Sequence, residues 1–242
     1  AWPPAVDGGS RLSGARPNLL VGGFPSAGPG SSDLYEIYGN FFYKNPDESL
    51  LQISGRAVVH DNIFAKPGGT AVRLQHHDLP LKLVNLYSNT IYGVDQGIRF
   101  ASSASENDAI VGNMIFAANP ISGSYRPDNA QDNLTDTVSS APNYVTAPSL
   151  TLGAMDFYPV NGAVSGSPVD LSPFSTNTHY LLDFNGQAKG DLRFRGAYAG
   201  EGSNPGWQLD AALKQGGPGP DPASPPDAPA NLRVDYGVAG VR

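Results

Sequence analysis

A short pattern, apolar-x-x-Asn-x-apolar, recurs through the first half of this 242-residue chain and constrains its fold more than any other feature. Successive copies are 22, 22, 27, 24 and 20 residues apart (18 to 40 to 62 to 89 to 113 to 133). Self-similarity at such a period is typical of repeat architectures. The repeated residues are Asn18, Asn40, Asn62, Asn89, Asn113 and Asn133.

Each period is too short for a strand-helix-strand unit, which needs about 30 residues. Short apolar runs alternate with Gly, Asn, Ser and Asp, and no segment keeps helical spacing. The alternative is a coil of short strands that stacks on the next coil, so that the stack buries one continuous core. We therefore predict an all-β, right-handed parallel β-helix of about five to six coils, with an irregular C-terminal closing segment.

The repeated Asn has a structural explanation. Asn tolerates left-handed backbone conformations at sharp bends, and stacked amides can hydrogen-bond from one coil to the next. We expect an Asn ladder, with inward-facing apolar residues three positions before each Asn and two after it. Asn is also common in ordinary turns.

Composition and charge narrow the classes of function. The net charge is −7 and no basic block occurs, which argues against a nucleic-acid partner. No apolar stretch is long enough to span a membrane. The chain has no cysteine, which rules out disulfides. We expect no cofactor; calcium is the alternative, but no ligand motif supports it.

The chain divides into five expected segments. They are an irregular N-terminal segment (1–17), the β-helix coils (18–135), a closing segment packed on the coils (136–215), a Pro/Gly-rich linker (216–228) and a final strand or disordered tail (229–242).

Several motifs after the repeats carry a resemblance to a known family. They read Asp156-Phe157-Tyr158-Pro159, Gly166-Ser167-Pro168-Val169-Asp170, Asp183-Phe184-Asn185-Gly186 and Gly196-Ala197-Tyr198. With the repeats, they resemble the closing part of right-handed parallel β-helix proteins of the pectate-lyase-like, secreted bacterial type. The tail from Pro225 is similar to the first strand of a fibronectin type III module. The resemblance implies a secreted or cell-surface protein, cut from a longer modular chain, that acts on or binds polysaccharide.

One row of residues is the main candidate site. Positions 10 to 12 after successive Asn residues should share a strand position, with the middle residue facing outward. This places Gln52, Arg73 and Arg99 in a row on neighbouring coils. Two adjacent guanidinium groups suit a uronate carboxylate, so we expect substrate binding here and a catalytic role for Arg73 and Arg99. The alternative is a solvated pair screened by acids such as Asp78 or Asp95.

Other candidates lie near this row or on the outer surface. The longest coil contains His76 and His77, of which His76 is a candidate catalytic residue and His77 a substrate-binding one. Tyr43 and Tyr92 are expected to face outward and to stack on sugar rings, as are Tyr38 and Tyr87. His60-Asp61 is a further candidate acid/base pair, and Lys82 is a candidate base. An ordinary structural role is the alternative for each.

Two functional hypotheses remain open at this stage. The first is an enzyme, as a lyase on an acidic polysaccharide rather than a glycoside hydrolase, because no paired carboxylates occur. The second is a non-catalytic structural or glycan-binding module of a larger secreted protein. The acids of the closing segment, Asp156, Asp170 and Asp183, are expected to tie down loops.

Overall fold

The computed structural model describes residues 16–22, 27–77 and 79–214. It is an all-β parallel solenoid of about four turns with a small C-terminal antiparallel sheet. This is the predicted fold class, with fewer turns than the five to six expected. Several expected parts of the chain lie outside the described residues. They are the linker, the tail, Asp78 and nearly all of the N-terminal segment. No helix in the described ranges is long and apolar enough to cross a membrane.

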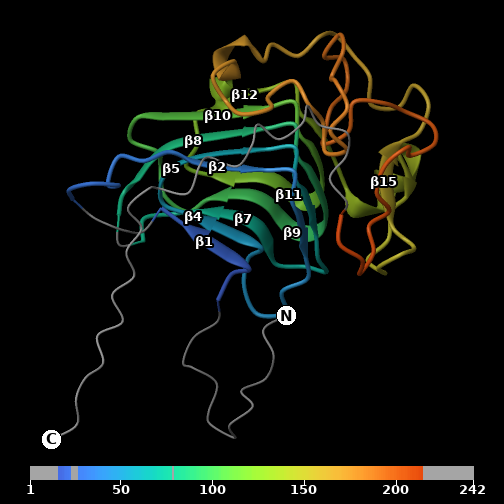
Figure 1. The fold of residues 1–242 in the computed structure, drawn as a ribbon. Coiled ribbons are helices and arrows are strands. Elements are labelled where there is room, and N and C mark those ends of the chain that lie inside the picture. The colour runs from blue at the N-terminus through green and yellow to red at the C-terminus, as the bar shows by residue number, and fades with distance from the viewer. Residues whose placement is uncertain (1–15, 23–26, 78, 215–242) are drawn as a thin grey trace, which may run out of the picture.

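Three faces run along the solenoid (Figure 1). The first face consists of β1 (Leu19–Val21), β4 (Leu51–Ile53), β7 (Thr70–Leu74) and the second halves of β9 (Thr90–Phe100) and β11 (Met114–Gly123). The second consists of β2 (Tyr35–Tyr38), β5 (Gly55–His60), β8 (Leu81–Tyr87), β10 (Asn107–Val111) and β12 (Ala130–Gln131). The third consists of β3 (Phe41–Tyr43), β6 (Ile63–Ala65), the first halves of β9 and β11, and β13 (Leu134–Asp136).

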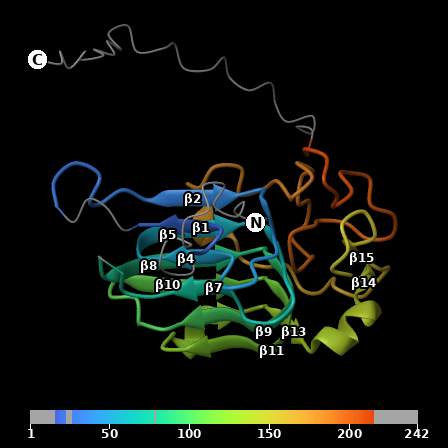
Figure 2. The same ribbon diagram turned by 90° about the horizontal axis from the view of Figure 1, so that it is seen from below.

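All pairs between coils are parallel, and the side-on view in Figure 2 shows the strands stacked along the solenoid axis. Because β9 and β11 continue from the third face into the first, those two faces form one eight-stranded sheet. The second face is a five-stranded sheet.

Apolar side chains from all three faces fill the inside of the coils. The residues expected to face inward around each Asn are buried there, including Val59, Leu86, Phe64 and Ile91. Each fully buried side chain of this size contributes about 1.5–3 kcal/mol. The Phe42 and Phe64 rings stack 4.8 Å apart across two coils.

The Asn ladder is present from Asn40 to Asn133. The Nδ2 atom of each Asn donates to Oδ1 of the next, at 3.1 Å from Asn62 to Asn89 and 3.0 Å from Asn89 to Asn113. The same oxygen also accepts the backbone N–H of the preceding Asn. Each bond ties one coil to the next, and the ladder thereby fixes the register of the stack.

Asn18 does not belong to this ladder, contrary to the prediction. It lies just before β1 on the first face, whereas the ladder lies between the second and third faces, and its Oδ1 accepts from Asn45 Nδ2 at 2.9 Å. Leu20, two residues later, therefore points outward and is 38% exposed. A chance match to the Asn pattern explains the error.

The left-handed conformation at each bend belongs to the residue before the ladder Asn and not to the Asn. The φ angles are +52° at Asp61, +51° at Ser88 and +62° at Gly112. Gly39 and Asp132 complete the row, with φ of +68° and +55°. The Asn side chain is thus free to make the ladder bonds while its neighbour makes the bend.

Residues 137–214, called the closing segment below, wrap the outside of the second and third faces (Figure 1). They contain η2 (Val138–Asn143), the antiparallel pair β14 (Val145–Ala147) and β15 (Asp156–Pro159), and η3 (Ser172–Phe174). A further short helix, η1 (Pro127–Asn129), precedes β12. One apolar cluster joins the closing segment to the third face, and another joins it to the second.

Candidate functional site

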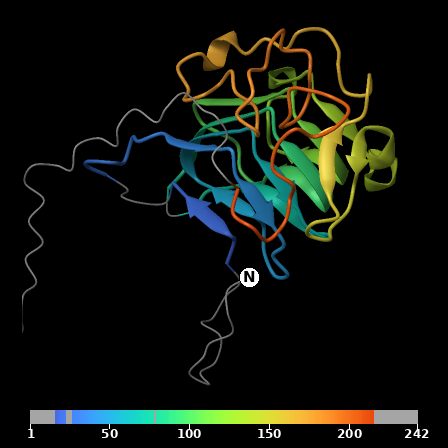
Figure 3. The same ribbon diagram turned by 45° about the vertical axis from the view of Figure 1, so that its right-hand side comes forward.

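The first face of the solenoid is the one that the closing segment leaves open. In Figure 1 the closing segment lies along the top and right of the coils, away from β1, β4 and β7, and Figure 3 shows the same segment after a 45° turn, with its orange-red end passing the blue N-terminal coils. Outward-pointing residues of the first face are therefore the ones that can meet an extended ligand.

A row of polar residues runs across this face in register. Gln52 of β4 lies opposite Arg73 of β7, and Arg73 lies opposite Arg99 of β9. Ser122 of β11 continues the row. The alignment expected from the sequence is therefore present. Gln52 differs from the expectation in one respect, because it is only 6% exposed.

Both guanidinium groups are held by glutamine carbonyl oxygens. Arg73 donates Nε–H to Gln75 Oε1 at 2.8 Å, and Arg99 donates from an Nη atom to Gln96 Oε1 at 3.1 Å. Ser122 Oγ donates to the same Gln96 oxygen at 3.2 Å. A neutral amide orients a guanidinium without cancelling its charge.

The described carboxylates contribute little to this pair. Arg73 has one long contact, 3.9 Å to Glu48 Oε1, and among the described residues no carboxylate forms an ion pair with Arg99. Four other described arginines are paired closely, namely Arg56 with Glu106, Arg126 with Asp108, Arg193 with Asp191 and Arg195 with Asp132. Two positive charges about 5 Å apart repel by about 0.8 kcal/mol even in water, so the row favours an anion.

Lys66 is a candidate that the sequence reasoning missed. It lies in the turn from β6 to β7, is buried, and donates from Nζ to the Glu48 carbonyl oxygen at 2.7 Å. Burial lowers the pKa of Lys66, and the charges of Glu48, Asp95 and Asp47 oppose that shift. Glu48 thus contacts both Lys66 and Arg73. No sequence signal distinguishes Lys66, because only the stacking of coils buries it.

The two histidines of the longest coil have structural contacts. His76 is exposed, and its Nδ1 accepts the backbone N–H of Leu81 at 2.9 Å. An imidazole that accepts at Nδ1 carries its hydrogen at Nε2, so the lone pair that a base needs is already used. His77 is half-buried and forms a β-bridge with Leu79. The catalytic role of His76 and the substrate-binding role of His77 stay predictions.

Tyr43 and Tyr92 are not exposed platforms, contrary to the prediction. Tyr43 donates its hydroxyl to the Leu150 carbonyl at 2.7 Å, and Tyr92 donates to that of Pro148 at 3.3 Å. The Tyr92 ring lies 5.0 Å from that of Phe157. The closing segment covers the third face from which both rings project, so that Tyr92 is buried and Tyr43 half-buried.

The remaining acid and base candidates are placed as follows. Lys82 lies on β8 of the second face, away from the arginine row. Asp156, Asp170 and Asp183 each accept a backbone N–H two residues later, and Asp183 also accepts those of Gln187 and Ala199. These three carboxylates tie down loops, as expected.

His60 and Asp61 form a pair, although consecutive residues at a bend were expected to diverge. The positive φ of Asp61 turns its carboxylate back, and Oδ2 lies 2.7 Å from His60 Nδ1. Lys189 of the closing segment approaches the same oxygen at 2.9 Å. All three side chains are buried between the coils and the closing segment and lie outside the arginine row.

No protein-family model, no curated protein and no solved structure matches the chain at a significant level. The function must therefore be argued from the chemistry of the site.

Proposed function

We propose that this protein binds an acidic, uronate-containing polysaccharide along its first face, with Arg73 and Arg99 contacting carboxylates. The observation that carries the proposal is the pair itself: two in-register guanidinium groups, oriented by Gln75 and Gln96, with no close carboxylate among the described residues. Strands in a stack repeat at about 4.8 Å, which gives a regular array of donors along an extended chain. A planar guanidinium can bind a carboxylate through two hydrogen bonds.

The proposal extends to where the protein acts. Acidic polysaccharides are extracellular polymers, so we place the protein outside the cell, secreted or on the cell surface. In this role it would act as one module of a larger secreted chain.

A second candidate function is cleavage of the bound polymer by β-elimination, and Lys66 is the observation that favours it. A base removes the proton from the carbon next to the carboxylate, a double bond forms, and the glycosidic oxygen leaves with its electron pair and takes up a proton. Arg73 would stabilise the charge that develops on the carboxylate. Lys66 is suited to be the base, because burial lowers its pKa.

A panel of polyuronates and neutral glycans tests both functions. Binding is followed by calorimetry, and elimination by the ultraviolet absorbance of unsaturated products. Binding confined to polyuronates without absorbance supports the binding function alone. Absorbance that grows with time supports cleavage. Equal affinity for neutral glycans, or no binding to any polyuronate, would overturn the proposal.

A further inference from the structure

Three ionisable side chains meet in the interface between the second face and the closing segment. His60 ends β5, Asp61 makes the bend that follows, and Lys189 comes from a loop of the closing segment. Asp61 Oδ2 lies 2.7 Å from His60 Nδ1 and 2.9 Å from Lys189 Nζ. The exposed fractions are 1% for His60, 2% for Asp61 and 6% for Lys189.

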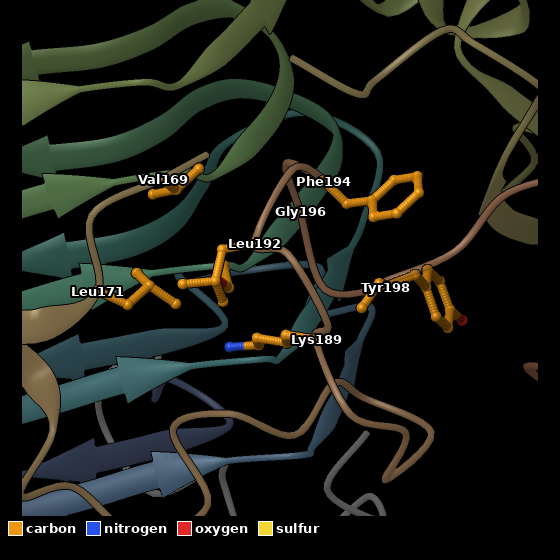
Figure 4. Close-up of a pocket in the computed structure, with 9 residues that line it drawn as sticks. Val169, Leu171, Lys189, Leu192, Phe194, Gly196 and Tyr198 are labelled. Carbon is orange, nitrogen blue, oxygen red and sulfur yellow. The ribbon is translucent and has the colours of Figure 1, made fainter. Parts of the chain in front are cut away.

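Apolar and aromatic groups surround this triad. The His60 ring is stacked between Tyr38 and Tyr87, with centroids 5.1 and 4.7 Å away. Lys189 Nζ lies 5.3 Å from the centroid of Tyr87. Figure 4 shows Lys189 beside a cavity of about 10 Å³, bordered by Leu171 and Leu192, which has room for about one water molecule. Bulk water is therefore excluded from the Asp61–Lys189 contact.

Lys189 Nζ is held by Asp61 Oδ2 and by the Tyr180 carbonyl oxygen at 3.0 Å, whereas the other two side chains are incompletely satisfied. Among the described residues, Asp61 Oδ1 and His60 Nε2 are buried without a hydrogen-bond partner. A buried charge with unpaired lone pairs is costly. A lysine nitrogen held at 2.9 Å from a carboxyl oxygen is also the arrangement from which an amide bond can form.

We propose that Asp61 and Lys189 become joined by an intramolecular isopeptide bond between Asp61 Cγ and Lys189 Nζ, with His60 carrying the proton. The reacting groups are fixed within hydrogen-bond distance, which removes the entropic cost of bringing them together. The bond would link residues 128 positions apart in a chain that has no cysteine for a disulfide.

The chemistry balances without a further reactant. The ammonium proton of Lys189 first passes to Asp61 Oδ2. The amine lone pair then attacks Cγ, and the carbonyl electrons move onto Oδ1. His60 takes a proton from Nζ and delivers it to Oδ2, which leaves as water while the Cγ–Oδ1 double bond reforms. The products are one amide and one water molecule, and His60 ends in its starting state.

The measurement that tests this proposal is the intact mass of the purified, denatured full chain. We expect a mass lower than that of the sequence by one water molecule, and a branched peptide containing Asp61 and Lys189 after proteolysis. The Lys189→Arg variant keeps the positive charge but should have the full mass. Lys214→Arg is the matched control, because the half-buried Lys214 Nζ contacts the carbonyl oxygens of Gly39 and Phe184, and it should keep the loss of water.

The role of His60 is tested by refolding. His60→Phe keeps a ring in the stack but removes the proton carrier, so the loss of water should appear at least tenfold more slowly than in the wild type. An equal rate would overturn the role given to His60. A wild-type chain of full mass, with Asp61 and Lys189 unmodified in separate peptides, would overturn the isopeptide bond. A loss of water that persists in Lys189→Arg would also overturn it.

Discussion

Asn62 and Asn89 lie in one hydrogen-bonded row, with Asn62 Nδ2 donating to Asn89 Oδ1 at 3.1 Å between neighbouring coils. This row holds the coils in register, and the register places Arg73 opposite Arg99 on another face. The ladder therefore connects to the candidate site through the backbone, without touching it.

The ladder should contribute strongly to stability where it is buried. Asn89→Ala removes the hydrogen bonds to the carbonyl oxygens of Val59 and Tyr87 and the oxygen that accepts the buried backbone N–H of Asn62, so we expect a loss of about 2–4 kcal/mol in the free energy of unfolding. The control is Asn40→Ala at the exposed end of the ladder, which should cost about 1 kcal/mol or less. Urea denaturation measures both. Equal losses at the two positions would contradict a ladder that depends on burial.

The bend before each ladder Asn should discriminate between glycine and other residues. Gly112 has a φ of +62°, and an added Cβ would lie 3.1 Å from Val169 Cγ1. Gly112→Ala should therefore lose about 1–3 kcal/mol. Ser88 already adopts a φ of +51°, so Ser88→Gly should change stability by only about 0.5 kcal/mol. The same denaturation experiment applies, and a harmless Gly112→Ala would show that the bend tolerates a side chain.

Alkaline pH should destabilise the docking of the closing segment. Burial raises the pKa of Tyr87, whose hydroxyl accepts from Asn177 of the closing segment. Above a pH of about 10 the unfolded chain ionises this tyrosine while the folded chain keeps it protonated. The unfolded state then binds fewer protons, so the free energy of unfolding falls as the pH rises.

Thermal unfolding between pH 8 and 11 measures this dependence, with Tyr87→Phe as the test variant. The variant lacks the ionisable group, so its stability should decline less steeply with pH than that of the wild type. Identical slopes would show that Tyr87 is not responsible.

If the protein cleaves its ligand, Lys66 should control the rate and not the affinity. Lys66→Met should abolish the ultraviolet signal of unsaturated product while leaving polyuronate binding within about twofold. Because burial lowers its pKa, the rate should rise with pH and level off below the value of 10.5 expected for an ordinary lysine. Cleavage that survives in Lys66→Met would remove this residue from the mechanism.

Much of the fold could be predicted from the sequence, because the coil repeat is local and its residues perform the same task in every copy. The Asn spacing was sufficient to predict the stacking, the inward positions such as Phe64, and the row of Gln52, Arg73 and Arg99. Asn18 was assigned wrongly because a single apolar neighbour is a weak match when no adjacent copy fixes its place.

The site environment could not be predicted, because it depends on how distant segments pack. The closing segment covers Tyr92 and brings Lys189 to Asp61. Neighbouring coils bury Lys66. The pairing of His60 with Asp61 depends on a positive φ at Asp61, which a generic bend does not reveal. Register follows from periodicity, but the partners of an outward side chain do not.

The central claim is that Arg73 and Arg99 bind carboxylates of an acidic polysaccharide, and the most direct measurement is the affinity of their glutamine variants for polygalacturonate. We expect Arg73→Gln and Arg99→Gln each to weaken binding about tenfold, which is about 1.4 kcal/mol, and to reduce its dependence on salt. Arg193→Gln removes the same charge from the closing segment, where Arg193 is paired with Asp191, and should leave affinity unchanged. Unchanged affinity in both first-face variants, or an equal loss in Arg193→Gln, would contradict the account.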